Sequence, residues 1–172
     1  MKASEIDGHL VLVGMMGTGK TTVGTVLAQR LGRPLIDSDA EVEARTGRTV
    51  REIFETDGEA AYRALETEAL VDALASPVPA VIAAAGGVVL AERNRRALKE
   101  QAGLVIWLRA DPAVLAGRVV VVEEGPVVVV SDPAGTLVRL ATERTPLYAE
   151  VADVTVDEDT KTPDQIADEI LA

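Results

Sequence analysis

One segment constrains what this chain can fold into more than any other, the eight residues Gly14–Thr21 with the sequence GMMGTGKT. They fit the pattern G-x-x-x-x-G-K-[ST] throughout. The apolar run Leu10–Val13 precedes them, and apolar residues recur at helical spacing from Lys20 to Leu31, where Gly32 marks a helix end. A strand, a glycine-rich loop and a helix in this order predict a P-loop, a loop that binds nucleotide phosphates.

The residue types in this loop explain why it suits phosphate. Glycines let the backbone approach the phosphate oxygens closely, so that successive N–H groups point at them. The N-terminus of the following helix adds a partial positive charge. Lys20 supplies a full charge for the β- and γ-phosphates, and Thr21 offers a hydroxyl to magnesium. We therefore predict ATP and Mg²⁺ as cofactors, with the nucleotide held by Gly17, Thr18, Gly19, Lys20, Thr21 and Thr22.

The rest of the chain alternates predicted strands and helices. The strands are expected at Leu10–Val13, Leu35–Ile36, Ala80–Ala84, Leu104–Leu108 and Val154–Val156. Such alternation predicts a three-layer α/β/α fold, a central parallel sheet of five strands covered on both faces, like that of nucleoside monophosphate kinases. A chain of 172 residues suits a single domain, residues 1–172.

Composition excludes several classes of function. The net charge of −11 disfavours nucleic acid and anionic membranes as partners. The chain has no cysteine and a single histidine, His9, which argues against thiolate chemistry and histidine metal clusters. No apolar run reaches the ~18 residues that span a bilayer, and the first residues lack a signal-peptide pattern. We expect a cytoplasmic enzyme, monomeric because nothing in the sequence demands more.

Two carboxylates follow the second predicted strand. Asp37 and Asp39 stand where that strand ends, at the edge at which open α/β sheets bind ligands. On an extended segment, side chains two residues apart project to the same side. One carboxylate would then serve magnesium through water and the other an acceptor hydroxyl, as phosphoryl transfer to an alcohol requires. The alternative is that Asp39 only caps a helix beginning at Ala40.

Arg63 and the pair Gly86-Gly87 each allow more than one interpretation. Arg63, on a helix predicted at Gly58–Ala75, is spaced to pair on the surface with Glu59 or Glu66. Gly86-Gly87 ends the third strand, where missing side chains would let a ligand touch the backbone. The alternative for these glycines is a tight turn between a strand and a helix.

Taken in order, these features resemble the shikimate kinase family over nearly the whole chain. After the P-loop, that family has an Asp-x-Asp pair, an aromatic-Arg pair, a glycine turn and an Arg-x-Pro-Leu-Tyr segment. Here these are Asp37–Asp39, Tyr62-Arg63, Ala85–Gly87 and Arg144–Tyr148. The family transfers the γ-phosphate of ATP to the 3-hydroxyl of shikimate, a step in aromatic amino acid biosynthesis through chorismate. The resemblance therefore implies this activity and shikimate as the small-molecule partner.

The resemblance also implies roles for residues around the acceptor. Asp39 would bind the ring hydroxyls and serve as the base. Arg63 and Arg144 would grip the shikimate carboxylate, since forked guanidinium contacts are strong and local in an acidic protein. Backbone at Gly86 and Gly87 would complete that site.

On the nucleotide side, the resemblance implies that Asp37 helps magnesium through water and that Lys20 keeps its catalytic P-loop role. Arg118 resembles the family's arginine that stacks on adenine, and Lys161 falls in the adenine-side loop. The alternative for both is a solvated surface charge. The family's acceptor-binding helical region would span about residues 40–75, and its lid about residues 119–132.

Two departures from the family pattern stand out. Ala85 replaces the first glycine of the glycine turn. Gly125 stands where the family's lid has an arginine that neutralises charge on the transferring phosphate, and valine tetrads flank it. Two alternatives to an active shikimate kinase therefore stay open: a related gluconate-type kinase, and a shikimate kinase-like protein that binds nucleotide without transferring phosphate.

Overall fold

The computed structural model describes residues 2, 5–119 and 133–172. Its centre is a five-stranded sheet in the order β2-β3-β1-β4-β5, and every adjacent pair is parallel. The strands are β1 (Leu10–Val13), β2 (Leu35–Asp37), β3 (Val81–Ala83), β4 (Leu104–Arg109) and β5 (Val154–Asp157). This confirms the predicted α/β fold with a five-stranded parallel sheet.

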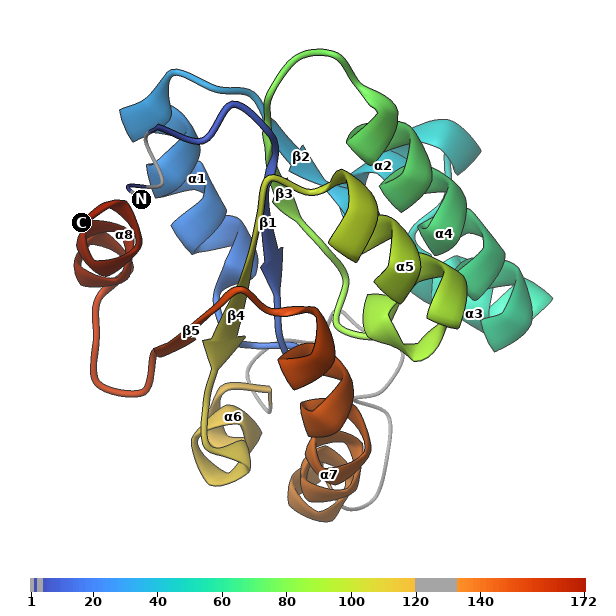
Figure 1. Cartoon of the computed structure of the whole chain (residues 1–172). Helices are drawn as coiled ribbons and strands as arrows, with labels where there is room; N and C mark the ends of the chain where they lie inside the picture. Colours follow the sequence, from blue (N-terminus) through green and yellow to red (C-terminus); the bar gives the residue numbers. More distant parts are fainter. Residues whose placement is uncertain (1, 3–4, 120–132) are drawn as a thin grey trace.

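Helices cover both faces of the sheet (Figure 1). Helices α1 and α8 lie together on one face, and α4, α5 and α7 cover the other. The helices are α1 (Lys20–Leu31), α2 (Ser38–Thr46), α3 (Val50–Asp57), α4 (Glu59–Ala75), the short 3-10 helix η2 (Val88–Leu90), α5 (Glu92–Gln101), α6 (Pro112–Val119), α7 (Pro133–Val151) and α8 (Pro163–Leu171).

The central strand β1 shows why its sequence is apolar without alternation. Leu10 and Leu12 belong to the hydrophobic cluster shared with α1 and α8, whereas Val11 and Val13 belong to the cluster on the other face. All four side chains are fully buried. A strand covered on both faces has no solvent side, so a continuous apolar run is what its position requires.

Several element boundaries differ from the predictions. Helix α2 begins at Ser38 rather than Ala40, and α7 begins at Pro133 rather than Thr136. The 3-10 helix η2 after the glycine turn was not predicted. The predicted lid, about residues 119–132 and including Gly125, lies outside the described residues except for Val119, which ends α6.

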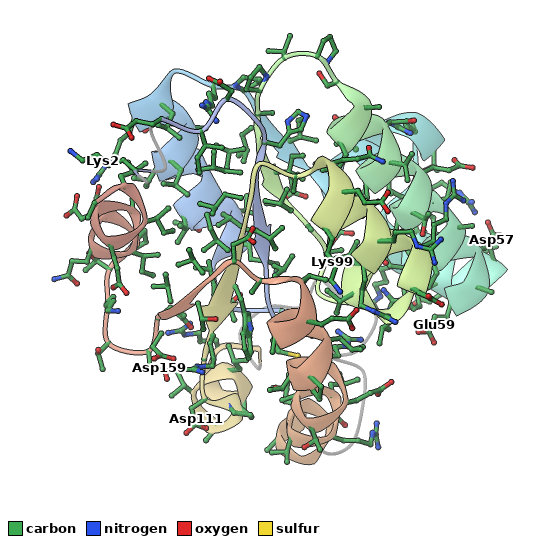
Figure 2. All side chains as sticks on the ribbon, viewed as in Figure 1. Lys2, Asp57, Glu59, Lys99, Asp111 and Asp159 are labelled. Carbon is green, nitrogen blue, oxygen red and sulfur yellow. The ribbon has the colours of Figure 1, made fainter. Side chains whose placement is uncertain are left out.

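The acidic character of the chain is spread over its surface. Carboxylates from well-separated elements, such as Asp57 on one side and Asp111 and Asp159 on the other, lie near the edges of the molecule in Figure 2. No helix within residues 5–119 and 133–172 has both the length and the apolar character needed to span a membrane.

Gly8 and Gly103 are in contact at the end of the sheet opposite the P-loop, and this contact allows a test of the packing. A Cβ at Gly103 would stand 2.8 Å from the Cα of Gly8 and 2.7 Å from Ile6. Gly103→Ala should therefore lower the free energy of unfolding by about 1–3 kcal/mol through overpacking.

The matched control is Gly117→Ala in helix α6, where a Cβ would meet no atom from elsewhere in the described residues within 4 Å. There alanine should raise the free energy of unfolding by about 0.5–1 kcal/mol because it favours the helix. Denaturant titration of both variants measures the two effects. Equal stability of the two variants would contradict the packing described for Gly103.

Candidate functional site

The P-loop adopts the tight conformation that its glycines predict. Gly14 has φ 148°, and a Cβ there would stand 2.5 Å from the carbonyl oxygen of Leu108. Thr18 is buried, and its hydroxyl donates to the Met15 carbonyl at 2.8 Å across the loop. Helix α1 begins at Lys20 without a side-chain cap. Its first N–H groups therefore face the loop and are available to phosphate oxygens.

Lys20 is anchored within the loop. Its Nζ donates to the carbonyl oxygens of Gly14 and Met15, each at 2.8 Å. Burial lowers the pKa of Lys20 to about 8, against the opposing effect of the Asp39 and Asp37 carboxylates. At neutral pH the ammonium group is therefore charged, preoriented and only partly hydrated, which suits a group that binds phosphate.

The structure brings together the two residues predicted to serve magnesium. The Thr21 hydroxyl donates to Asp37 Oδ2 at 2.5 Å. Within the described part of the chain no group of three or more His, Cys, Asp or Glu side chains could hold a metal. Magnesium is usually bound by one or two protein oxygens together with phosphates and water. The Thr21-Asp37 pair beside the P-loop fits that kind of site.

The predicted helix cap belongs to Asp37 rather than Asp39. Asp37 Oδ1 accepts a hydrogen bond from the Ala40 N–H at 3.0 Å and is the N-cap of α2. Because α2 begins two residues earlier than predicted, Asp39 lies within its first turn. The expectation that both side chains project from one extended segment was therefore wrong, and so was the capping alternative for Asp39.

Asp39 instead reaches the partner helix α4. Its Oδ1 accepts a hydrogen bond from the Tyr62 hydroxyl at 2.5 Å. Burial raises the pKa of Asp39, and the bond from Tyr62 partly offsets that rise. Burial and the neighbouring carboxylates of Asp39 and Glu66 raise the pKa of Tyr62 well above its usual range. The phenol is therefore a hydrogen-bond donor at any working pH.

Asp39 and the P-loop line one cavity of about 420 Å³. Its walls come from the P-loop, the end of β2 and the segment after β3, and they include Lys20, Thr21, Thr22, Asp37, Asp39 and Gly86. A carboxylate, an ammonium group and a phosphate-binding loop thus face one open cavity. That arrangement suits transfer of a phosphoryl group to an acceptor that Asp39 orients.

Two arginines flank the glycine turn after β3. A Cβ at Gly86 would stand 3.4 Å from Arg144 Nη1, and one at Gly87 would stand 2.1 Å from Arg63 Nη1. At Gly87 the Arg63 guanidinium occupies the space that a side chain would need, whereas at Gly86 the nearest atom would be the backbone nitrogen of Met16 at 3.3 Å. Arg144 is 3% exposed, and its Nε, like that of Arg63, is buried without a partner among the described residues. Unpaired buried donors at this turn favour an anionic ligand.

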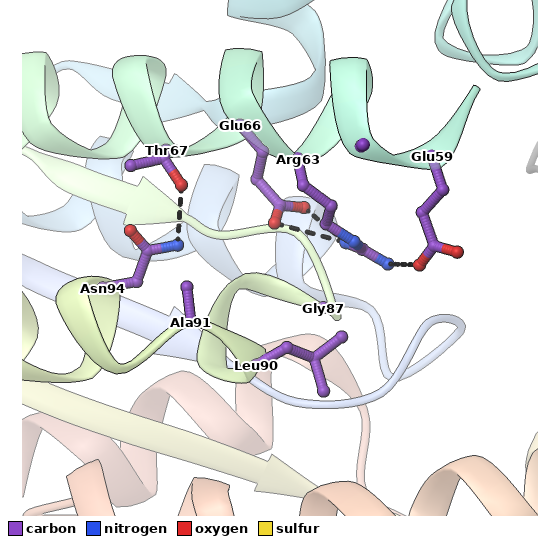
Figure 3. Close-up of a pocket in the computed structure, with 9 residues that line it drawn as sticks. Glu59, Arg63, Glu66, Thr67, Gly87, Leu90, Ala91 and Asn94 are labelled. Carbon is purple, nitrogen blue, oxygen red and sulfur yellow. Dashed lines mark hydrogen bonds and ion pairs between the residues drawn. The ribbon is translucent and has the colours of Figure 1, made fainter.

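Arg63 also forms both ion pairs that its spacing predicted. Its Nη1 lies 3.0 Å from Glu66 and its Nη2 lies 3.4 Å from Glu59. Figure 3 shows the three side chains descending from α4 toward Gly87, beside a cavity of about 550 Å³. Glu66 is 1% exposed, so it is an internal partner rather than a surface one. Sequence reasoning gave it no site role, although its spacing from Arg63 pointed to it.

The residues predicted on the adenine side lie in different surroundings. Arg118 Nη1 donates to the Gly17 carbonyl at 3.1 Å and to Glu158 Oε1 at 2.5 Å, which places it against the P-loop. Glu158 is buried and was not predicted from the sequence. Lys161 pairs with Glu169 of α8 at 2.5 Å.

Comparison with known proteins identifies the family. The shikimate kinase family model matches residues 16–172. The chain belongs to the shikimate kinase family. It is 44% identical to a shikimate kinase of Ruegeria pomeroyi over 99% of this chain and 86% of that protein. It is also 44% identical to one of Symbiobacterium thermophilum, over 95% of this chain and 94% of that protein.

Solved structures of the family agree with the fold. A shikimate kinase of Acinetobacter baumannii, solved in complex with shikimate, has a TM-score of 0.93 at 37% identity. The alignment covers 98% of this chain and 93% of that one. A gluconokinase of Sinorhizobium meliloti has a TM-score of 0.61 at 23% identity, which indicates the shared fold alone.

The two carboxylates that hold Arg63 give a matched test of the site's electrostatics. Glu66→Gln removes the buried charge that compensates Arg63 and should lower the free energy of unfolding by about 3 kcal/mol. Glu59→Gln removes a partner whose side chain is 65% exposed and should cost less than about 1 kcal/mol. Chemical denaturation measures both. A cost for Glu59→Gln equal to that for Glu66→Gln would contradict the difference in burial.

Proposed function

We propose that this chain transfers the γ-phosphate of ATP to the 3-hydroxyl of shikimate, giving shikimate 3-phosphate and ADP, in the route through chorismate to aromatic amino acids. The observation that carries the proposal is the layout of the site. Lys20 and Asp39 line one cavity, while Arg63 and Arg144 lie against the glycine turn at its edge. A hydroxyl and a carboxylate on one small ring would meet these two sets of groups.

The chain's own groups divide the work of the transfer. The P-loop N–H groups and Lys20 hold the β- and γ-phosphates and neutralise charge as it develops on the transferring group. Asp39 orients the acceptor hydroxyl and takes its proton. Arg63 and Arg144 hold the ring through its carboxylate, which fixes the distance of the hydroxyl from the phosphate. Backbone at Gly86 and Gly87 lets the ring approach.

We propose that Thr21 and Asp37 hold magnesium, Asp37 through water. A magnesium ion held there would supply positive charge that offsets the charge of the phosphates. Thr21 and Asp37 fix where that charge is placed relative to Lys20. We also assign Arg118 to the adenine side, supported by its bond to the Gly17 carbonyl, and place Lys161 in the same loop region.

We propose further that the helical region of about residues 40–75 holds the acceptor and that residues 119–132 act as the lid. We also propose that the chain works as a cytoplasmic monomer. The first assignment is supported by Arg63, which lies in α4 of that region, and by Asp39, which comes directly before it in α2. A gluconate-type acceptor is less well supported, because this chain is 44% identical to shikimate kinases and only 23% identical to the gluconokinase structure.

The decisive measurement is coupled ADP release with ATP and Mg²⁺, in the presence of shikimate, gluconate or no acceptor. We expect release that depends on shikimate. Asp39→Asn should abolish this transfer while leaving ATP binding largely intact, because the change removes only the group that orients and deprotonates the acceptor.

Other outcomes would redirect the proposal. Gluconate-dependent release would identify the related kinase. ATP binding without any turnover would favour a nucleotide-binding protein that does not transfer phosphate. Restoring the lid arginine with Gly125→Arg would then show whether its absence explains the loss. Parental turnover by Asp39→Asn would exclude Asp39 as the base.

A separate variant tests the magnesium assignment. Asparagine is as good a helix N-cap as aspartate, so Asp37→Asn should leave the free energy of unfolding within about 0.5 kcal/mol of the parent. Loss of the charge should raise the Mg²⁺ concentration needed for half-maximal turnover by about tenfold or more. Turnover titrated with Mg²⁺ measures the shift, and an unchanged Mg²⁺ requirement would remove Asp37 from the site.

A further inference from the structure

The hydroxyl of Tyr62 is a polar group at the acceptor site to which the proposed reaction gives no part. It belongs to α4, yet it donates to Oδ1 of Asp39 in α2 at 2.5 Å. The Tyr62 side chain is buried, with 4% of the residue exposed. A buried hydroxyl needs a partner. The Tyr62 hydroxyl lies beside the carboxylates of both Asp39 and Glu66, and its hydrogen bond to Asp39 links a core side chain to the cavity that the P-loop lines.

The surroundings of Tyr62 hold its hydroxyl in one place. The ring lies 4.7 Å, centroid to centroid, from that of Phe54 in α3. It also belongs to a hydrophobic cluster formed by α2, α3 and α4, whose other buried members are Val42, Val50, Ile53 and Ala69. A ring packed in this way cannot change its rotamer without opening the cluster. The hydroxyl is therefore a fixed point against which the Asp39 carboxylate is held.

We propose that Tyr62 is a positioning residue for phosphoryl transfer, because its hydroxyl holds Asp39 with the second carboxylate oxygen toward the acceptor hydroxyl. Oδ1 is engaged by Tyr62, so Oδ2 is the oxygen that serves an acceptor in the cavity that Asp39 lines. The inference rests on the proposed function and assigns to that same site a residue outside the reacting groups.

The hydrogen bond from Tyr62 has two opposing effects on catalysis, because it lowers the basicity of Asp39 and also fixes the position of its carboxylate. A donor to a carboxylate makes it a weaker base, which lowers the rate of proton abstraction. Phosphoryl transfer, however, passes through a loose transition state in which positioning and charge neutralisation supply most of the catalysis. A misplacement of 1 Å costs about 100-fold in such reactions. Fixing the carboxylate therefore gains more than the lost basicity costs.

Tyr62→Phe tests the inference, since it removes the hydroxyl and keeps the ring. We expect kcat for shikimate-dependent ADP release to fall by about 10-fold to 100-fold. The KM for ATP should stay within about twofold of the parent, because the P-loop is untouched. A hydroxyl that served only packing would change stability and leave kcat at the parental value.

The control is Thr46→Val, which removes a hydroxyl from α2, the helix that carries Asp39. Thr46 Oγ1 donates to the Val42 carbonyl at 2.8 Å, at the end of the helix away from Asp39. We expect its kcat to stay within about twofold of the parent. An equal loss of kcat in both variants would attribute the effect to a general loosening of α2 and overturn the inference.

A crystal structure of Tyr62→Phe gives a second readout that does not depend on activity. We expect the Asp39 carboxylate to rotate or to occupy more than one orientation, whereas the parent holds one. The inference is overturned if Asp39 keeps its parental orientation in Tyr62→Phe. It is also overturned if the parent is active and the kcat of Tyr62→Phe equals that of the parent. If the parent shows no shikimate-dependent ADP release, the proposed function fails. The orientation of Asp39 then still decides the role of Tyr62.

Discussion

The in-register pairing of the three strands β2, β3 and β1 is the constraint on which the site depends. Leu12 of β1 lies opposite Ala83 of β3, and Ala83 lies opposite Asp37 of β2. Because the strands are parallel, the P-loop, Asp37 and the glycine turn leave the sheet at one edge and at one level. A slip in either pairing would move Asp37 away from Thr21, so the register of these strands sets the chemistry as well as the fold.

The cationic side chains at this edge of the sheet carry a charge that is opposite to the net charge of the whole protein. With a net charge of −11, the chain offers no long-range attraction to an anionic substrate. Arg63 and Arg144 lie instead against the glycine turn, and Lys20 lies in the P-loop. These sites are half-buried or buried, where each charge interacts more strongly than in water. Glu66 pairs with Arg63, and the carbonyl oxygens of Gly14 and Met15 hold Lys20.

The sequence supported the main features of this site and missed its cross-contacts. The P-loop, the five strands and the pairing of Arg63 with Glu59 and Glu66 followed from local patterns. The start of α2 did not, because Asp37 and Asp39 are both good caps and only the folded chain selects one. Contacts such as Tyr62 with Asp39 and Arg118 with Glu158 join segments far apart in the chain, and no short-range spacing encodes them.

The sequence by itself determined the phosphate-binding loop and the alternating elements, because glycine conformations and apolar periodicity act over a few residues. The order of motifs along the chain was also enough to indicate the family. The tertiary structure alone decided which carboxylate caps α2 and which one Tyr62 holds. It also decided that the Arg63 guanidinium fills the space beside Gly87 and that Arg144 comes close to Gly86. These outcomes depend on how α2, α4 and α7 pack together, and packing is a property of the whole fold.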